Sequence, residues 1–123
     1  MIDAGEGVWR GLVKTATAHD GLLADALLPS KMTRVFLTHL HSDHTVGLPS
    51  SMLFPWTYGR TDTLDVHGAV GVGQLVSGLL DAYHGDLHER LYGPEEKNPT
   101  GWMTVGHEIE SPGPVYELSL IHI

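Results

Sequence analysis

The sequence has no cysteine among its 123 residues. Disulfides and thiolate metal ligands are therefore excluded, and any metal site in this chain must use nitrogen and oxygen donors. Basic residues are also few, with 7 Lys and Arg against 15 Asp and Glu and a formal net charge of −8 at pH 7. This charge argues against a general basic surface for nucleic acid. A nucleic-acid substrate is not excluded, because bound cations would make a metal site itself positive.

Long apolar runs are missing as well, and no segment of the sequence is long enough to cross a bilayer. The chain is 41% hydrophobic and 18% charged, which is ordinary for a globular protein with a modest core. We therefore expect one domain at most, no membrane partner and, by default, a cytoplasmic setting.

Four potential metal ligands follow directly after the short apolar run at residues 35–37. They are His39, His41, Asp43 and His44. On an extended segment, residues two apart project to the same face, so the first three can converge on one point. A His-rich loop can also be merely solvated, but imidazole and carboxylate groups crowded behind a buried strand favour a cation such as zinc, manganese or iron. The sequence therefore predicts a metal site at the carboxyl end of a strand.

The His-x-His-x-Asp-His pattern resembles the hallmark loop of the metallo-β-lactamase superfamily. The resemblance implies that His39 and His41 hold a first metal ion, and that Asp43 and His44 hold a second. Asp43 would also have a catalytic role, because in such sites it can orient the attacking hydroxide.

Three further segments resemble the ribonuclease Z-like branch of that superfamily, which also includes arylsulfatase-like proteins. Residues 2–7, IDAGEG, are similar to a strand-end Asp-x-Gly segment, and residues 47–49, GLP, are similar to the turn after the ligands. Residues 64–71, LDVHGAVG, look like a later strand and turn, although His67 and Ala69 stand where Tyr and Pro are more usual.

The fold that the resemblance implies is α/β, a partial metallo-β-lactamase αββα sandwich in which residues 1–123 form a single incomplete domain. The superfamily pattern continues with a third His, a bridging Asp and a final His, and His122 is the only guess for the third His. We therefore expect an internal fragment, roughly the first half, that lacks the opening strands and the second half.

The function that the resemblance implies is a metal-dependent hydrolase, first a ribonuclease Z-like phosphodiesterase that uses a metal-bound hydroxide. Two zinc ions are the implied cofactors, with manganese or iron as alternatives. The substrate would be a phosphodiester or an ester, RNA among them, and a homodimer is one assembly to consider. The fragment alone is expected to be inactive. The alternative is a non-catalytic metal-binding or interaction module that retains only the first ligand loop.

Periodicity predicts helices over residues 6–14, 20–28, 49–54 and 74–92, and strands over 35–37, 64–67, 103–110 and from 115 onward. Pro55 should end the third helix. His84 and His88 on the fourth have a spacing that can hold a metal, but they fall beside the apolar stripe, which favours a solvated face. Asp86 and Arg90 favour a surface ion pair.

Aromatic side chains gather around the end of the third predicted helix. Phe54, Trp56 and Tyr58 could line a pocket, but an aromatic cluster of this size is more often part of the core. We also expect Trp9 to be part of the core rather than of a binding site.

Overall fold

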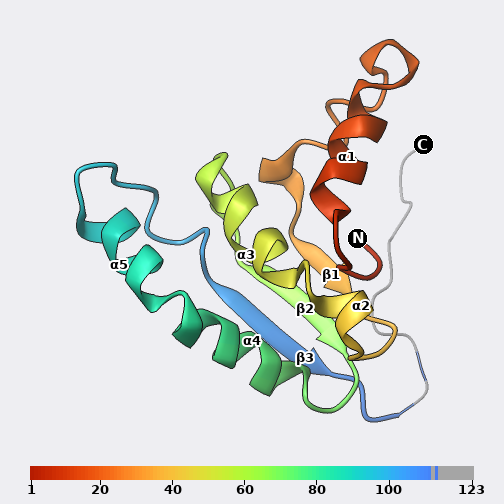
Figure 1. Cartoon of the computed structure of the whole chain (residues 1–123), viewed down its shortest axis with the longest axis vertical. Helices are drawn as coiled ribbons and strands as arrows, with labels where there is room; N and C mark the ends of the chain where they lie inside the picture. The colour runs from red at the N-terminus through yellow and green to blue at the C-terminus, as the bar shows by residue number, and fades with distance from the viewer. Residues whose placement is uncertain (112, 114–123) are drawn as a thin grey trace.

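In the computed structural model, which describes residues 1–111 and 113, three short strands form a parallel sheet. The strands β1 (Arg34–Phe36), β2 (Leu64–Gly68) and β3 (Thr104–Glu108) lie side by side in that order. Ile2 forms an isolated parallel bridge with Phe36, so the amino-terminal segment runs beside β1 (Figure 1). The described residues are therefore α/β, as predicted.

The helices connect the parallel strands, as parallel pairing requires. They are α1 (Val8–Thr17), α2 (Ser42–Thr45), α3 (Leu48–Thr57), α4 (Val72–Ala82) and α5 (His84–Tyr92), with 3-10 turns η1 (His19–Gly21) and η2 (Pro29–Lys31). No helix in the described residues is both long enough and apolar enough to span a membrane.

The core lies between one face of the sheet and the helices α3 and α4 (Figure 1). Its buried members are Ala4, Val35, Leu37, Leu48, Met52, Leu64, Val66, Val72 and Val76. Leu64 and Val66 alternate with half-buried residues along β2, as expected for a strand with one face in the core. This core holds the end of β1 in place, and the predicted ligand loop begins there.

The helix predicted over residues 20–28 is wrong. The chain forms only η1 there, with Asp20 in the left-handed region (φ 56°), and continues in turns. Leu22 is 81% exposed and Leu23 is 39% exposed, so much of the apolar stripe of this segment is not packed against the rest of the chain. A short helix without such packing is unstable in water.

Pro55 does not end α3, which continues to Thr57. Proline lacks the N–H that the carbonyl of Ser51 would accept in an unbroken helix. The fully buried Arg60 supplies a replacement, because its Nη1 donates to the Ser51 oxygen at 3.2 Å. The prediction failed because this donor comes from outside the helix.

Arg60 also joins segments that are far apart in the sequence. Its guanidinium donates to the carbonyl oxygens of Met52 at 2.5 Å, Met32 at 3.1 Å and Gly101 at 2.9 Å. Met32 precedes β1 and Gly101 precedes β3. The Arg60 side chain therefore connects the segments before both outer strands with α3. Burial lowers the pKa of Arg60 to about 10, and the guanidinium therefore stays charged at pH 7.

The segment 74–92 is two helices rather than one. Tyr83 (φ −96°, ψ 12°) separates α4 from α5, and Gly85 follows in the first turn of α5, where it weakens a continuous helix. The predicted ion pair between Asp86 and Arg90 is confirmed, with Nε 2.9 Å from Oδ1.

The aromatic residues around α3 divide between core and surface. Trp56 is fully buried, as predicted, and Trp9 packs against Phe54 with ring centroids 5.3 Å apart. Tyr58 is 63% exposed, and it shares with Phe54 and Tyr83 a cavity of about 500 Å³ between α3 and α5. The core assignment was therefore wrong for Tyr58 and for Phe54, which is 39% exposed.

Three rings stack across the sheet on the face opposite the core. Phe36, His67 and His107 occupy matching positions on the three strands, with ring centroids 5.1 Å and 4.7 Å apart. His107 Nε2 lies 2.8 Å from Asp65 Oδ1. Burial lowers the pKa of His67, and the neighbouring His107 and Arg34 act in the same direction against the opposing effect of Asp65.

The lowered pKa of His67 predicts a loss of stability in mild acid. As the pH falls below about 6.5, His67 takes up a proton more readily in the unfolded chain than in the folded one, so the free energy of unfolding decreases. Denaturant titrations between pH 5 and pH 8 measure this slope, which His67→Phe should flatten. The exposed His84→Phe is the matched control, and an equal slope in both variants would contradict the assignment to His67.

Candidate metal centre

The four predicted ligands come from a loop and a one-turn helix. β1 ends at Phe36, so His39 and His41 lie in the loop that follows, whereas Asp43 and His44 belong to α2. The prediction that an extended segment carries His39, His41 and Asp43 is therefore wrong for Asp43, which lies in α2. The backbone N–H of His44 donates to the carbonyl of His41 at 3.0 Å, which folds the chain back and brings the ligand atoms together.

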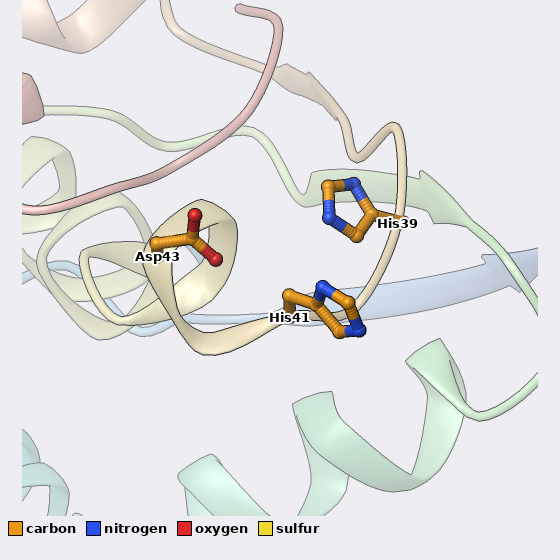
Figure 2. A group of neighbouring side chains, drawn as sticks. All are labelled: His39, His41 and Asp43. Atoms are coloured by element: carbon orange, nitrogen blue, oxygen red, sulfur yellow. The ribbon is translucent and has the colours of Figure 1, made fainter.

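His39, His41 and Asp43 converge on one point. Each offers one ligand atom, and these three atoms all lie within 4.8 Å of one another (Figure 2). His39 is half-buried, whereas His41 and Asp43 are exposed, so one side of the cluster is open to solvent. The arrangement combines a half-buried imidazole with two side chains that are accessible to solvent.

His44 lies beside this cluster rather than within it. Its ring centroid is 4.1 Å from that of His39, and its Nε2 is 3.6 Å from Asp43 Oδ2. Its other nitrogen, Nδ1, lies 2.8 Å from Asp3 Oδ2. All four predicted residues are thus neighbours, but only three of them share one potential ligand point.

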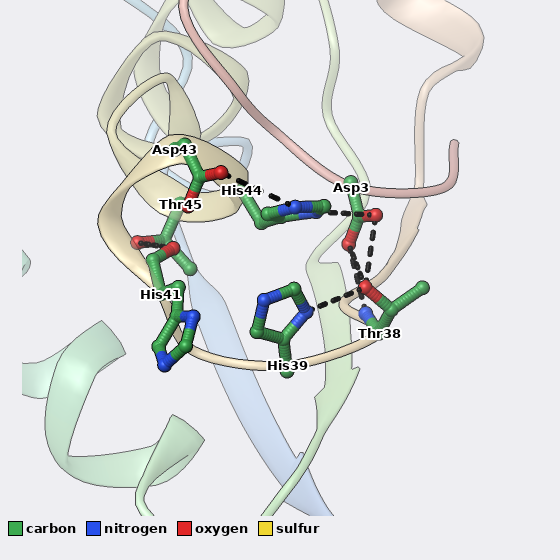
Figure 3. A network of polar contacts seen from close by, with 7 residues as sticks. All are labelled: Asp3, Thr38, His39, His41, Asp43, His44 and Thr45. Atoms are coloured by element: carbon green, nitrogen blue, oxygen red, sulfur yellow. Dashed lines mark hydrogen bonds and ion pairs between the residues drawn. The ribbon is translucent and has the colours of Figure 1, made fainter.

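Asp3 anchors a network behind the imidazoles (Figure 3). Its Oδ1 accepts the backbone N–H of Thr38 at 2.8 Å, and the Thr38 hydroxyl lies 3.0 Å from His39 Nδ1. The Thr38 N–H, followed by the bond from His44, lowers the pKa of Asp3. The hydrogen bond with Asp3 in turn raises the pKa of His44.

Sequence reasoning missed this role of Asp3. The residue lies within the segment 2–7 that carried part of the resemblance, but nothing in its spacing indicates contact with residues 35 and 41 positions later. The network forms only once the amino-terminal segment has docked beside β1.

Close backbone contacts hold that segment against α2. Ala4 N donates to the carbonyl of His44 at 2.8 Å, and Gly47 N donates to the carbonyl of Ala4 at 2.7 Å. A Cβ on Gly5 would collide with the carbonyl of Asp43, and one on Gly47 would collide with the carbonyl of Gly5. These two glycines therefore permit the approach that places Asp3 beside His44.

The donor set fits a divalent cation. Imidazole nitrogens and a carboxylate oxygen are ligands for zinc, manganese or iron, and metal-binding histidines commonly donate their second ring nitrogen to a carboxylate, as the His44–Asp3 pair is placed to do. His84 and His88 are exposed and belong to no group of three potential ligands in the described residues. His122, the guess for a further ligand, and the strand predicted from residue 115 lie outside the described residues.

Several known proteins are similar to this chain in sequence. No family model matches the chain. The chain is 34% identical over 120 residues to a ribonuclease Z of Lactococcus lactis subsp. cremoris, which covers 95% of this chain and 34% of that protein. It is 37% identical over 98 residues to a ribonuclease Z of Streptococcus mutans, covering 72% of this chain and 28% of that protein.

A ribonuclease Z of Porphyromonas gingivalis is 36% identical over 83 residues, which is 68% of this chain and 24% of that protein. The chain thus spans about a third or less of the length of these relatives. Over most of its own length, however, the resemblance found in the sequence is confirmed: the chain is related to ribonuclease Z, a member of the metallo-β-lactamase superfamily.

Proposed function

We propose that this chain is part of a metal-dependent hydrolase of phosphodiesters. The observation that carries the proposal is the convergence of His39, His41 and Asp43 on one point, in a chain similar to ribonuclease Z. His44 is the fourth proposed ligand, because its Nε2 faces Asp43 while Nδ1 faces a carboxylate. In this proposal residues 1–123 form one incomplete domain of the αββα sandwich type.

Each side chain has a distinct part in the proposed site. A bound divalent cation, with zinc first and manganese or iron as alternatives, would supply Lewis acidity and bring the pKa of a water molecule toward neutrality. The Asp43 side chain is 77% exposed, so its carboxylate can both ligate and accept a proton or hydrogen bond from an incoming group. The half-buried His39 and His44 fix the inner wall of the site.

The proposed substrate follows from the relatives and from the charge of the chain. The relatives are named ribonuclease Z, which favours RNA as the phosphodiester. The chain has a net charge of −8. In this proposal a polyanion such as RNA is therefore attracted by the bound cations rather than by the chain's own surface. We place the reaction in the cytoplasm, consistent with the sequence prediction.

A chimera tests the proposed function. This chain replaces the matched 120 residues of the Lactococcus lactis ribonuclease Z, so that the other two thirds of that protein complete the site. We expect the zinc-loaded chimera to hydrolyse bis(p-nitrophenyl) phosphate, and Asp43→Ala to reduce turnover by more than about 100-fold, beyond the effect typical of an outer-shell change.

The isolated chain provides the comparison, and we expect it to show no turnover with zinc or manganese. A folded chimera that binds zinc but shows no turnover would contradict the hydrolase proposal and favour the non-catalytic module. His88→Ala is the matched control, because His88 is exposed and lies outside the cluster.

A further inference from the structure

We propose that Asp3 and Thr38 are positioning residues that fix the tautomers of His39 and His44, so that both rings present Nε2 to a metal ion. The inference deepens the metal-binding function proposed above and rests on it. It concerns two residues that do not themselves belong to the ligand cluster, one of them 36 positions upstream of His39.

The contact between Asp3 and His44 is direct. Asp3 Oδ2 lies 2.8 Å from His44 Nδ1. An ionised carboxylate can only accept hydrogen bonds, and Asp3 already accepts one from the backbone N–H of Thr38 at 2.8 Å. The proton of this hydrogen bond therefore belongs to His44 Nδ1. In the neutral ring, Nε2 then carries the free lone pair, and Nε2 is the nitrogen that lies 3.6 Å from Asp43.

The contact between Asp3 and His39 is relayed by a hydroxyl group. Thr38 Oγ1 lies 3.1 Å and 3.0 Å from the two Asp3 oxygens and 3.0 Å from His39 Nδ1. A hydroxyl has one proton to donate, and the carboxylate accepts it. The Thr38 oxygen must then accept a hydrogen bond from the N–H at His39 Nδ1, which leaves the lone pair of His39 Nε2 free as well. The carboxylate of Asp3 therefore determines the tautomers of both imidazoles, those of His39 and His44 (Figure 3).

The backbone supports this arrangement on both sides. Asp3 is held in the left-handed region (φ 55°), a conformation that non-glycine residues adopt sparingly, and its N–H donates to the carbonyl of Phe36 at 2.8 Å. The N–H of Thr38 donates to Asp3 Oδ1 independently of the hydroxyl. Removing the hydroxyl alone should therefore leave both residues in place.

His41 provides an internal reference. Within the described residues its ring accepts and donates no side-chain hydrogen bond, although it shares the ligand point with His39. The proposal predicts that its tautomer does not depend on Asp3 or Thr38.

The test is long-range ¹H–¹⁵N NMR on the metal-free chain at about pH 9, well above the ordinary imidazole pKa of about 6.5. We expect Nδ1–H tautomers for His39 and His44 in the wild type. Thr38→Val should move His39 toward the Nε2–H tautomer and leave His44 unchanged, and Thr38→Ser should restore His39. Asp3→Asn, whose amide can donate to Nδ1, should shift His44 to Nε2–H.

Zinc affinity gives a second measurement on the same variants. Thr38→Val should weaken binding about 10-fold, the lower end of the range for outer-shell partners of a ligand, and Thr38→Ser should recover it. Thr57→Val is the matched control, because the exposed Thr57 hydroxyl donates only to a carbonyl within α3.

The two outcomes separate the inference from the proposed function. An unchanged His39 tautomer in Thr38→Val would overturn the inference, even if zinc binds normally. Failure of the wild-type chain to bind zinc would overturn the proposed function, whereas the tautomers of the metal-free chain would still decide the positioning role.

Discussion

Arg60→Met should remove more than about 3 kcal/mol from the free energy of unfolding, the largest stability effect that we expect from a single substitution in this chain. The side chain is fully buried and donates to four carbonyl oxygens, those of Met32, Ser51, Met52 and Gly101. Methionine fills similar space but leaves these acceptors unsatisfied. Each buried acceptor without a partner costs about 1–3 kcal/mol, and relief of the buried charge offsets part of the sum.

Urea denaturation followed by circular dichroism measures this effect. Arg60→Lys should give an intermediate loss, because an ammonium group keeps the charge but cannot reach all the carbonyls that lie around the edge of the planar guanidinium. Arg10→Met is the matched control, since Arg10 is exposed on α1, and it should change the free energy by no more than about 0.5 kcal/mol. Equal midpoints for Arg60→Met and Arg10→Met would contradict the role of Arg60.

His41→Ala should lower zinc affinity by more than about tenfold, because it removes one of three donors that share a point. The ring is exposed and contacts the ring of His39 with centroids 4.6 Å apart, so the free energy of unfolding without metal should change little. This separation of binding from stability distinguishes a ligand from a structural residue. Competition with a chromophoric chelator measures the affinity directly.

His88→Ala is the control for that measurement. It removes an exposed imidazole of the same chemistry from α5, at a distance in sequence from the ligand loop. If His41→Ala and His88→Ala weaken zinc binding equally, adventitious binding to surface histidines explains the result, and the site is not the one proposed.

The residues of the proposed metal centre stand out in the sequence, but the way in which their side chains meet could not be predicted from it. Four potential donors within six residues predict a metal site, and this prediction does not depend on the secondary structure of the segment. The extended geometry expected of His39, His41 and Asp43 depends on β1 continuing, whereas Phe36 is the last residue of β1. The short helix α2 then supplies the convergence.

Three features missed by sequence reasoning depend on packing against distant parts of the chain or on its absence. A local rule correctly identifies Pro55 as a helix breaker, but the donor that compensates for it is Arg60, whose direction is set by tertiary packing. Asp3 reaches His44 only through the docking of the amino-terminal segment. The segment 20–28 has the apolar pattern of a helix, but most of its apolar residues stay exposed. Periodicity alone does not show whether such residues will be packed.

Zinc titration of the isolated chain, followed through its histidine side-chain NMR signals, tests the metal site most directly. We predict that the signals of His39, His41 and His44 shift together at the lowest zinc concentrations, while those of His84 and His88 stay in place. If His84 and His88 respond first, or if the three loop histidines respond independently of one another, the proposed metal centre is wrong.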